Sequence, residues 1–324
     1  MANKRLLAIG EALIDFIPDK TGCAFADVTA FSPKVGGAPA NVCGAFAKLG
    51  GRAALISQLG DDPFGHKIAD ELSACGIDVS AVAFTAEANT ALAFVSLAPD
   101  GNRTFSFYRK PSADMLLTPE QVDARWFDDA YALHFCSVSL GDFPMKDAHE
   151  RAIALAREHG ALVSFDPNLR FPLWDDHALL RQRVRAFIPR CDVLKISDEE
   201  LAFITGEREI ACAVPALFAQ GVRLVIYTCG RDGAYALTRT AQVFSPALPV
   251  RAVDTTGAGD GFIGSFLWAL QSRGWDAANL DALDAETLRV CLDFSNRFCA
   301  QSIRFPGAIA SYPRLEQMET ASES

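Results

Sequence analysis

A segment from Asp254 to Asp260 has the composition of a site that handles phosphate. Its sequence, Asp-Thr-Thr-Gly-Ala-Gly-Asp, ends in a carboxylate after two glycines that let the backbone approach a ligand closely. An amphipathic helix is predicted to follow at once, because apolar residues recur along one helical face from Phe262 to Leu270. The N–H groups and positive dipole at a helix N-terminus attract anions. A carboxylate there would repel a resting anion, so we expect Asp260 to act as a base beside a reacting phosphoryl group.

Polar residues also follow several apolar runs that predict buried strands. Strands are predicted at 132–136, 161–165, 193–196 and 224–228. Asp166-Pro-Asn-Leu-Arg170, Lys195-Ile-Ser-Asp-Glu-Glu200 and Thr228-Cys-Gly-Arg-Asp-Gly233 lie at the ends of the last three. Because the carboxyl ends of parallel strands meet at the sheet edge where ligands bind, these groups suit a nucleotide and its metal. Taken singly, Ser197 with Glu200 is also an ordinary capping box, and 230–233 an ordinary turn.

The first half of the chain adds candidate contacts at two further turns. A buried strand is predicted at 6–10, and Glu11 and Asp15 follow it; an edge or turn role for Asp15 is an equal alternative. Gly36-Gly37-Ala-Pro-Ala-Asn41 then leads into a helix predicted at 42–49. The glycines permit close backbone approach and Asn41 offers amide donors, although a plain helix entry explains the same residues.

Two β-rich runs interrupt the α/β pattern. Residues 90–97 and 103–109 flank Pro99-Asp-Gly-Asn102 and predict an inserted hairpin. With the stretch near 15–33, the hairpin is expected to form a small sheet that covers the site as a lid and excludes water from phosphoryl transfer. Its half-apolar faces need cover, either from the same subunit or from the same sheet of another subunit; the second alternative gives the homodimer through this lid that we expect.

Regular alternation of strands and helices defines the fold class. Helices are predicted at 145–159, 177–187, 198–205, 213–220, 262–273 and 283–302. The alternation predicts an α/β fold with a doubly wound, mostly parallel sheet flanked by helices, together with the small β-sheet lid. A single domain over residues 1–324 is expected, with the lid formed by about 14–34 and 90–110.

Composition favours a cytoplasmic protein with small-molecule ligands. The 324 residues carry a net charge of −10, which disfavours nucleic acid and anionic membranes as partners. The nine cysteines form no C-x-x-C pair and several lie in apolar runs, as expected for free thiols in a reducing compartment. A strand is predicted within the first ten residues, and no apolar run approaches the roughly 18 residues of a membrane span, so neither a signal peptide nor a span is expected.

Other catalytic motifs fit less well. Gly259-Asp-Gly-Phe-Ile-Gly264 matches the dinucleotide pattern G-x-G-x-x-G, but it lies late in the chain and would aim Asp260 at a pyrophosphate. The sequence lacks G-x-x-x-x-G-K-[ST] and the H-R-D and D-F-G motifs of protein kinases. Its five histidines show no metal-ligand spacing, and we expect His149 and His159 on the surface of one helix and its end. A zinc or Ser-His-Asp hydrolase therefore has little support.

The sequence resembles the ribokinase-like (PfkB) carbohydrate kinase family and, within it, the bacterial fructokinases. The likeness covers nearly the whole chain: residues 36–41 resemble the first family signature and 254–260 the more specific second one. Residues 10–16, 107–114 and 166–170 are similar to the fructokinase branch. The resemblance implies a ribokinase-like fold and transfer of the γ-phosphoryl group of Mg-ATP to a sugar hydroxyl.

The resemblance also implies roles for residues at matching positions. Asp260 would be the catalytic base, and the amides of Gly257, Ala258, Gly259 and Asp260 would hold the phosphoryl oxygens. The implied sugar contacts are Asp15, Gly37, Asn41, Phe107, Arg170 and Asp260. The implied nucleotide contacts are Lys195, Glu200, Thr228, Gly230, Arg231, Gly233, Gly257, Gly259 and Asn296.

Two cations follow from the same resemblance. Glu200 matches the glutamate of the family's N-x-x-E motif, which organises Mg²⁺ mostly through water, although Ser197 replaces the motif's Asn as in fructokinase-like members. Positions that match a monovalent-cation site are Asp254, Thr256, Ser302, Phe305 and Gly307, so potassium is a further candidate ligand. The segment 304–307 departs from the family's usual small or basic residues there.

The leading functional hypothesis is an ATP-dependent fructokinase that makes fructose 6-phosphate. A 2-keto-3-deoxygluconate kinase and a ribonucleoside kinase acting on aminoimidazole riboside are alternatives on the same scaffold. A non-catalytic relative that binds sugar or a partner protein is the alternative of a different class. The intact Asp260 and both glycines of its loop count against that last alternative.

Overall fold

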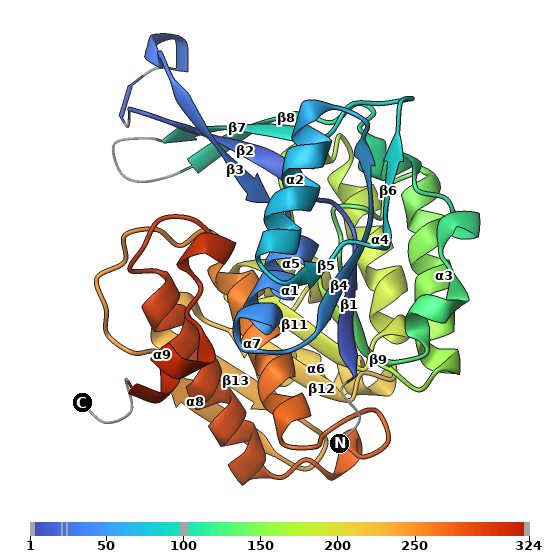
Figure 1. Ribbon diagram of the computed structural model, residues 1–324. Helices are drawn as coiled ribbons and strands as arrows, with labels where there is room; N and C mark the ends of the chain where they lie inside the picture. Colours follow the sequence, from blue (N-terminus) through green and yellow to red (C-terminus); the bar gives the residue numbers. More distant parts are fainter. Residues whose placement is uncertain (1–3, 21, 24, 98–102, 321–324) are drawn as a thin grey trace.

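A ten-stranded sheet forms the centre of the protein in a computed structural model that describes residues 4–20, 22–23, 25–97 and 103–320 (Figure 1). Its strands are β1 (Arg5–Ile9), β4 (Ala53–Gly60), β5 (Ile77–Asp78), β6 (Val82–Thr85), β9 (Ala130–Cys136), β10 (Leu162–Asp166), β11 (Val193–Ser197), β12 (Leu224–Thr228), β13 (Gly233–Leu237) and β14 (Gln242–Pro246). The spatial order is β14-β13-β12-β11-β10-β9-β1-β4-β5, with β6 paired to β4. The predicted doubly wound, mostly parallel sheet is confirmed.

Helices cover both faces of this sheet (Figure 1). They are α1 (Ala38–Lys48), α2 (Pro63–Ala74), α3 (Pro144–Glu158), α4 (His177–Phe187), α5 (Asp198–Thr205), α6 (Ile210–Ala219), α7 (Ala258–Ser272), α8 (Ala285–Ser302) and α9 (Leu315–Thr320). Leu6 and Ala8 of β1 pack into the core beneath α1, α2, α7 and α8, whereas Leu7 and Ile9 face α3 to α6. Because both faces of the sheet are buried, the sequences of its strands are continuous apolar runs rather than alternating apolar and polar residues.

Two antiparallel strands, β13 and β14, extend the sheet beyond β12 and were not predicted. Both strands are short, and the first starts at Gly233, which was expected to lie in a turn and to contact the nucleotide. Gly233 has a φ of 123°, and a Cβ built on it would lie 2.2 Å from the carbonyl oxygen of Ser245 in β14. The glycine therefore allows β13 and β14 to pack closely.

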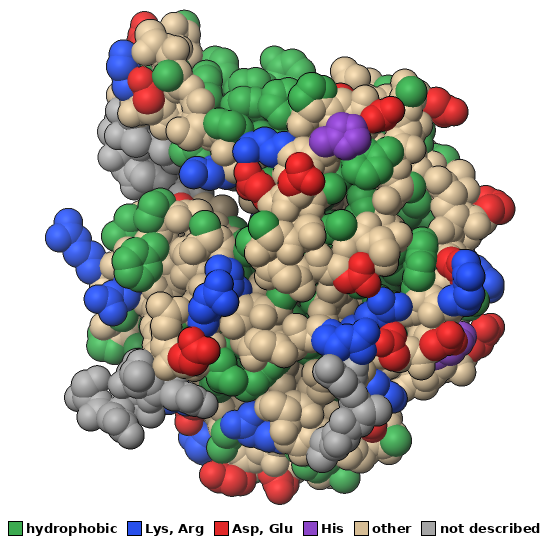
Figure 2. Space-filling view, viewed as in Figure 1, with side chains coloured by type: hydrophobic (Ala, Val, Ile, Leu, Met, Phe, Trp, Pro, Cys, Tyr) green, Lys and Arg blue, Asp and Glu red, His purple; other side chains and the backbone are tan. Residues whose placement is uncertain are grey.

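A separate four-stranded sheet stands beside the main body at the upper left of Figure 1. It is ordered β3 (Phe31–Gly36), β2 (Leu13–Pro18), β7 (Leu92–Leu97) and β8 (Arg103–Tyr108), and we call it the small sheet. The predicted hairpin supplies β7 and β8, and its turn at 99–102 lies outside the described residues. Figure 2 shows a hollow between the small sheet and the main body.

Three local predictions differ from the structure. Helices α1 and α7 begin four residues earlier than predicted, at Ala38 and Ala258, so Asn41 and Asp260 lie inside their first turns rather than before them. Pro39 at the second helical position and the left-handed Gly257 before α7 explain both starts. His149 was expected on the surface but is fully buried against Phe135, and burial lowers its pKa to about 4.

All nine cysteines are free thiols, as the sequence analysis expected. Four of them, Cys43, Cys136, Cys191 and Cys291, are buried, and Cys212 is exposed. Within the described ranges, no helix combines the length and the apolar composition that crossing a bilayer requires.

Candidate active site

Asp260 lies at the start of α7 with each carboxylate oxygen held by a different side-chain amide. Asn41 from α1 donates to Oδ2 at 2.9 Å, and Asn168 from the loop after β10 donates to Oδ1 at 3.1 Å. Helices α1 and α7 come close because Gly264 has no side chain, and a Cβ there would lie 2.8 Å from both Ala45 and the carbonyl of Val42. The two amides fix the plane of the carboxylate at the carboxyl edge of the sheet.

Burial makes Asp260 a stronger base than an exposed aspartate. Only 6% of the residue is exposed, and burial raises the pKa of its carboxyl group. The amide of Asn41, the nearby charges of Arg170 and Lys195, and the amide of Asn168 partly oppose that rise in pKa. The carboxyl group is thus held in place by two amide donors, and its surroundings increase its affinity for a proton.

The first turn of α7 presents backbone amides beside this carboxylate. Ala258 already donates its N–H to the carbonyl of Thr255 at 3.1 Å, which closes a turn, so this amide does not face a ligand as predicted. The amides of Gly259 and Asp260 have no backbone acceptor among the described residues, as is usual in the first helical turn. Two such N–H groups at the positive end of a helix dipole are suited to an anion, and we call this place the anion-binding position.

A buried ammonium group lies next to the same turn. A Cβ built on Gly259 would be 3.3 Å from Nζ of Lys195, so glycine lets the lysine approach the helix N-terminus. Nζ also donates to Oδ2 of Asp166 at 2.6 Å. Burial alone lowers the pKa of Lys195, but the charges of Asp166, Glu200 and Asp260 more than offset this and raise it overall. Lys195 is therefore a permanent cation at the anion-binding position.

The small sheet supplies a second group of polar residues. Asp15, Ala93 and Phe107 occupy directly paired positions on β2, β7 and β8, so their side chains share one face. The carboxylate of Asp15 lies over Gly36, where a Cβ would be 2.2 Å from Oδ2. Gly37 has a φ of 110° and no room for a Cβ against the carbonyl of Glu11, so its glycine is required by the packing itself.

Several implied nucleotide contacts have structural partners. The side-chain amide of Asn296 donates to the hydroxyl of Ser245 at 2.8 Å and to the carbonyls of Ser245 and Pro246, and so ties α8 to β14. Thr228 ends β12 directly opposite Ser197 of β11. Gly230 and Arg231 follow in an exposed turn. Thr228, Gly230 and Arg231 lie at the end of β12, the strand next to β11 with Lys195. Packing alone accounts for the residue types at Asn296 and Gly233.

Two residues of this site were absent from the predicted set. Asn168 and Asp166 belong to the predicted 166–170 segment, but only Arg170 was singled out there. Asn168 has a φ of 45°, a left-handed conformation that is uncommon outside glycine and that directs its amide at Asp260. The sequence signal available was the position of Asp-Pro-Asn at a strand end, which by itself does not reveal which side chain turns inward.

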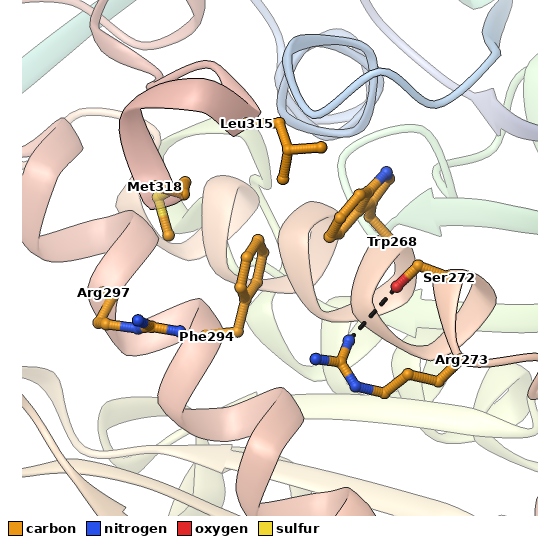
Figure 3. A pocket seen from close by; sticks show the side chains of 7 residues that line it. All are labelled: Trp268, Ser272, Arg273, Phe294, Arg297, Leu315 and Met318. Atoms are coloured by element: carbon orange, nitrogen blue, oxygen red, sulfur yellow. Dashed lines mark hydrogen bonds between the residues drawn. The ribbon is translucent and has the colours of Figure 1, made fainter. Parts of the chain in front are cut away.

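The functional site is distinct from a pocket at the other end of α7. That pocket has a volume of about 420 Å³ and is lined by Trp268, Ser272, Arg273, Phe294, Arg297, Leu315 and Met318 (Figure 3). These residues come from the C-terminal part of α7 and from α8 and α9, whereas Asp260 lies in the first turn of α7.

Comparison with known proteins identifies the family. Residues 3–315 match the model for the pfkB family carbohydrate kinases. The chain belongs to this family. It is 41% identical to a probable fructokinase-5 of Arabidopsis thaliana, covering 97% of this chain and 96% of the relative. It is 40% identical to fructokinase-1 of Oryza sativa subsp. japonica, covering 98% of this chain and 99% of the relative.

Solved structures of related kinases have the same fold. A fructokinase from Xylella fastidiosa with bound ATP superposes with a TM-score of 0.91 at 32% identity, covering 100% of this chain and 99% of that one. A double mutant of the Vibrio cholerae O395 fructokinase, in a form with bound fructose, ADP and potassium, gives a TM-score of 0.87 at 32% identity, covering 98% of each chain. The ribokinase-like fold is confirmed by these likenesses.

In this pfkB kinase, the groups that would hold Mg²⁺ are the carboxylates of Asp166 and Glu200, which lie near Lys195. Oδ1 of Asp166 is buried without a hydrogen-bond partner among the described residues. Burial raises the pKa of Asp166 to about 6; the charge of Lys195 opposes this rise, and the charge of Glu200 adds to it. Glu200 accepts from the amide of Leu169 at 2.7 Å and from both donors of Ser197, as in a capping box. An unpartnered carboxylate oxygen fits a hydrated Mg²⁺, which binds largely through water.

The loop before α7 brings together part of the implied potassium site. Asp254 accepts from the amide and hydroxyl of Thr256 at 2.8 and 2.6 Å, and from the amide of Gly307 at 2.9 Å. Ser302 is buried and its hydroxyl lies 3.0 Å from that of Ser311, whereas Phe305 is mostly exposed. The 302–307 loop is thus tied to the 254–256 loop directly beside the anion-binding turn.

Proposed function

We infer that the protein is an ATP-dependent fructokinase that transfers the γ-phosphoryl group of ATP to a hydroxyl of D-fructose, forming fructose 6-phosphate and ADP. The observation that carries this inference is the buried Asp260 carboxylate, held between Asn41 and Asn168 at the N-terminus of α7. Membership of the pfkB family and the likeness to fructokinases over nearly the whole chain support the choice of sugar.

The proposal gives one task to each charged group. As the new oxygen–phosphorus bond forms, the sugar hydroxyl loses its proton to Asp260, and the bond from phosphorus to the ADP oxygen breaks. Charge gathers on the phosphoryl oxygens, where the amides of Gly259 and Asp260 and the ammonium of Lys195 stabilise it. A single preorganised donor of this kind typically lowers the barrier by about 3 kcal/mol.

The small sheet is proposed to serve as the lid over the sugar. Asp15 and Phe107 share one face of it, on either side of Ala93, so a hydroxyl-binding carboxylate and an apolar ring enter the site together. Arg170 is exposed, and its charge lowers the pKa of Asp260. It would approach the sugar from the main body. Closure of the lid would exclude the water that competes with the sugar for the phosphoryl group.

Two cations complete the proposal. Mg²⁺ bound to ATP would be held through water by Asp166 and Glu200, and would neutralise charge on the phosphates. Potassium would bind at the loop of Asp254, Thr256 and Gly307, next to the anion-binding turn. The fructokinase of Vibrio cholerae with bound potassium supports the second proposal. Replacing potassium by choline at constant ionic strength should lower kcat; equal rates in both salts would contradict it.

A coupled assay of ADP release over a panel of sugars tests the function. Fructose should give the highest kcat/KM, above 2-keto-3-deoxygluconate, aminoimidazole riboside and ribose, and inactivity toward every sugar would refute the kinase assignment. Asp260→Asn keeps the volume and the helix start but removes the base, so kcat should fall by at least about a thousand-fold. Calorimetric fructose binding should be largely retained in this variant.

A further inference from the structure

Two side chains that have no role in the proposed chemistry donate hydrogen bonds to the backbone of the turn proposed to bind the phosphoryl group. Tyr312 donates its hydroxyl to the carbonyl of Gly257 at 2.7 Å. Cys299 from α8 donates its thiol to the carbonyl of Ala258 at 3.3 Å. Two consecutive carbonyl groups of the 257–259 segment are therefore anchored to the C-terminal part of the chain.

Anchoring a carbonyl also fixes the N–H group of the following residue, because the peptide unit is planar and trans. Holding the Gly257 carbonyl orients the N–H of Ala258, which closes the turn on Thr255. Holding the Ala258 carbonyl orients the N–H of Gly259, one of the two amides directed at the phosphoryl position. The Cys299 contact thus sets the direction of one donor that stabilises developing charge, and the Tyr312 contact holds the turn from which that donor projects.

The packing around Tyr312 leaves little room for the turn to move. Gly257 has a φ of 71°, and a Cβ on it would lie 2.6 Å from the Tyr312 hydroxyl oxygen and 2.6 Å from Cβ of Ala308. One turn later, a Cβ on Gly261 would lie 3.0 Å from the same ring. Tyr312 is only 3% exposed and packs against Phe298 at 5.3 Å between ring centres.

Both anchoring groups keep their protons near neutral pH and remain donors. Burial raises the pKa of Tyr312 well above its usual value, and the charges of Asp260 and Cys299 add to the rise. Burial also raises the pKa of the Cys299 thiol to about 12, against the opposing charge of Lys195. A phenolate or thiolate would instead repel the carbonyl oxygens.

We propose that Tyr312 and Cys299 are positioning residues for phosphoryl transfer, which hold the carbonyl groups of Gly257 and Ala258 at the start of α7 so that the amide of Gly259 faces the transferring group. This inference rests on the proposed kinase function. Because the carbonyl of Gly257 also accepts from the amide of Gly261 at 2.7 Å, loss of the tyrosine hydroxyl leaves no unsatisfied oxygen. The effect should therefore appear in catalysis rather than in stability.

Tyr312→Phe removes the hydroxyl and keeps the ring. Its kcat should fall about ten-fold, less than the hundred-fold or greater loss typical of removing a direct donor, while the KM for fructose stays near the wild-type value. Cys299→Ala should lower kcat by a smaller factor, because a thiol is a weak donor. The matched control is Tyr131→Phe, which removes a buried hydroxyl without a partner at the opposite end of the sheet and should leave kcat unchanged.

A planar phosphoryl mimic separates positioning from general loosening of the fold. Affinity for ADP with aluminium fluoride, measured in the presence of fructose, should fall about ten-fold in Tyr312→Phe, matching the loss in kcat, while affinity for ADP alone stays constant. The inference would be overturned if Tyr312→Phe kept the wild-type kcat and the wild-type affinity for ADP with aluminium fluoride. It would also be overturned if the affinity for ADP alone fell by the same factor as the affinity for the mimic. Wild-type protein without any sugar kinase activity would instead refute the proposed function, so the two failures are distinct.

Discussion

Asn168 donates its side-chain amide to Oδ1 of Asp260 at 3.1 Å from a backbone whose φ is 45°. A left-handed asparagine costs free energy, on the order of 1 kcal/mol or more, and such residues persist where the surrounding structure imposes them. Here the conformation directs the amide to the oxygen that Asn41 does not reach. Asn168 thus fixes the rotation of the Asp260 carboxylate, which is the proposed base.

Removing the Asn168 amide should impair catalysis even where the backbone strain is relieved. Asn168→Gly accepts a positive φ freely, whereas Asn168→Ala does not, yet both lose the same donor. We expect kcat to fall by a similar factor, about 10- to 100-fold, in both variants, with alanine the less stable of the two. Steady-state kinetics and thermal unfolding measure the two effects. A normal kcat in Asn168→Gly would show that the amide does not matter for turnover.

Lys195 and Asp166 allow a structural role to be separated from a catalytic one. Lys195→Met leaves the buried carboxylate of Asp166 without its cation, so stability should fall by roughly 3–5 kcal/mol. Adding Asp166→Asn removes that unpaired charge and should restore much of the stability. Activity should stay low in the double variant, because the cation beside Gly259 is still missing and a carboxylate proposed to hold Mg²⁺ is lost as well. Recovery of both stability and activity would make the pair purely structural.

Glu11 should make stability depend on pH near neutrality. Burial raises its pKa to about 7, against the opposing charge of Arg109, while the unfolded chain has the ordinary value of about 4.5. The folded state therefore binds the extra proton between these pH values, and its contribution to stability is complete below pH 4.5 and lost as pH rises to about 7. The buried His149 acts in the opposite direction, since its folded pKa of about 4 favours the folded state as pH rises toward 6.5.

Comparison with Glu11→Gln isolates this one group. Denaturant unfolding between pH 5 and 8 should show that the variant gains stability relative to wild type as pH rises, by up to a few kcal/mol. The carboxylate oxygens lie 3.3 Å from the amide of Ala38 and 3.4 Å from the hydroxyl of Ser139. Glutamine can accept from the Ala38 amide with its oxygen and donate its own amide to the Ser139 hydroxyl. A stability difference that does not change with pH would contradict the raised pKa.

The parts of the fold that follow from local patterns were predictable, and those that depend on partners far away were not. Apolar runs located the parallel strands, because burial on both faces leaves a continuous signal. The edge strand β14 lacked it, since its residues alternate between exposed and buried, and β13 is a five-residue run that begins with Gly233. Asp260 was found because a carboxylate at a helix start is unusual for an anion site. Asn168 and Tyr312 were missed because their roles arise from a left-handed backbone and a contact across 55 residues.

The small sheet carries an aromatic face that is proposed to form a homodimer. Phe16 and Phe94 stack at 4.7 Å, Phe31 and Tyr108 meet Phe94 edge-on, and Tyr108 remains 65% exposed. Figure 2 shows hydrophobic side chains gathered over β2 and β7. Exposed apolar patches of this kind usually contact another protein, and a second copy of the same sheet is self-complementary by symmetry.

Sedimentation velocity at micromolar concentrations tests this proposal. Wild type should sediment as a dimer, and Tyr108→Lys should shift it toward monomer because a buried, unpaired cation opposes association. Phe84→Lys is the control, since Phe84 is a 42% exposed aromatic residue on β6, outside the small sheet. A monomeric wild type, or dissociation by both substitutions alike, would argue against an interface on this face. If Tyr108→Lys dissociates the dimer but retains kcat, each lid works within its own subunit.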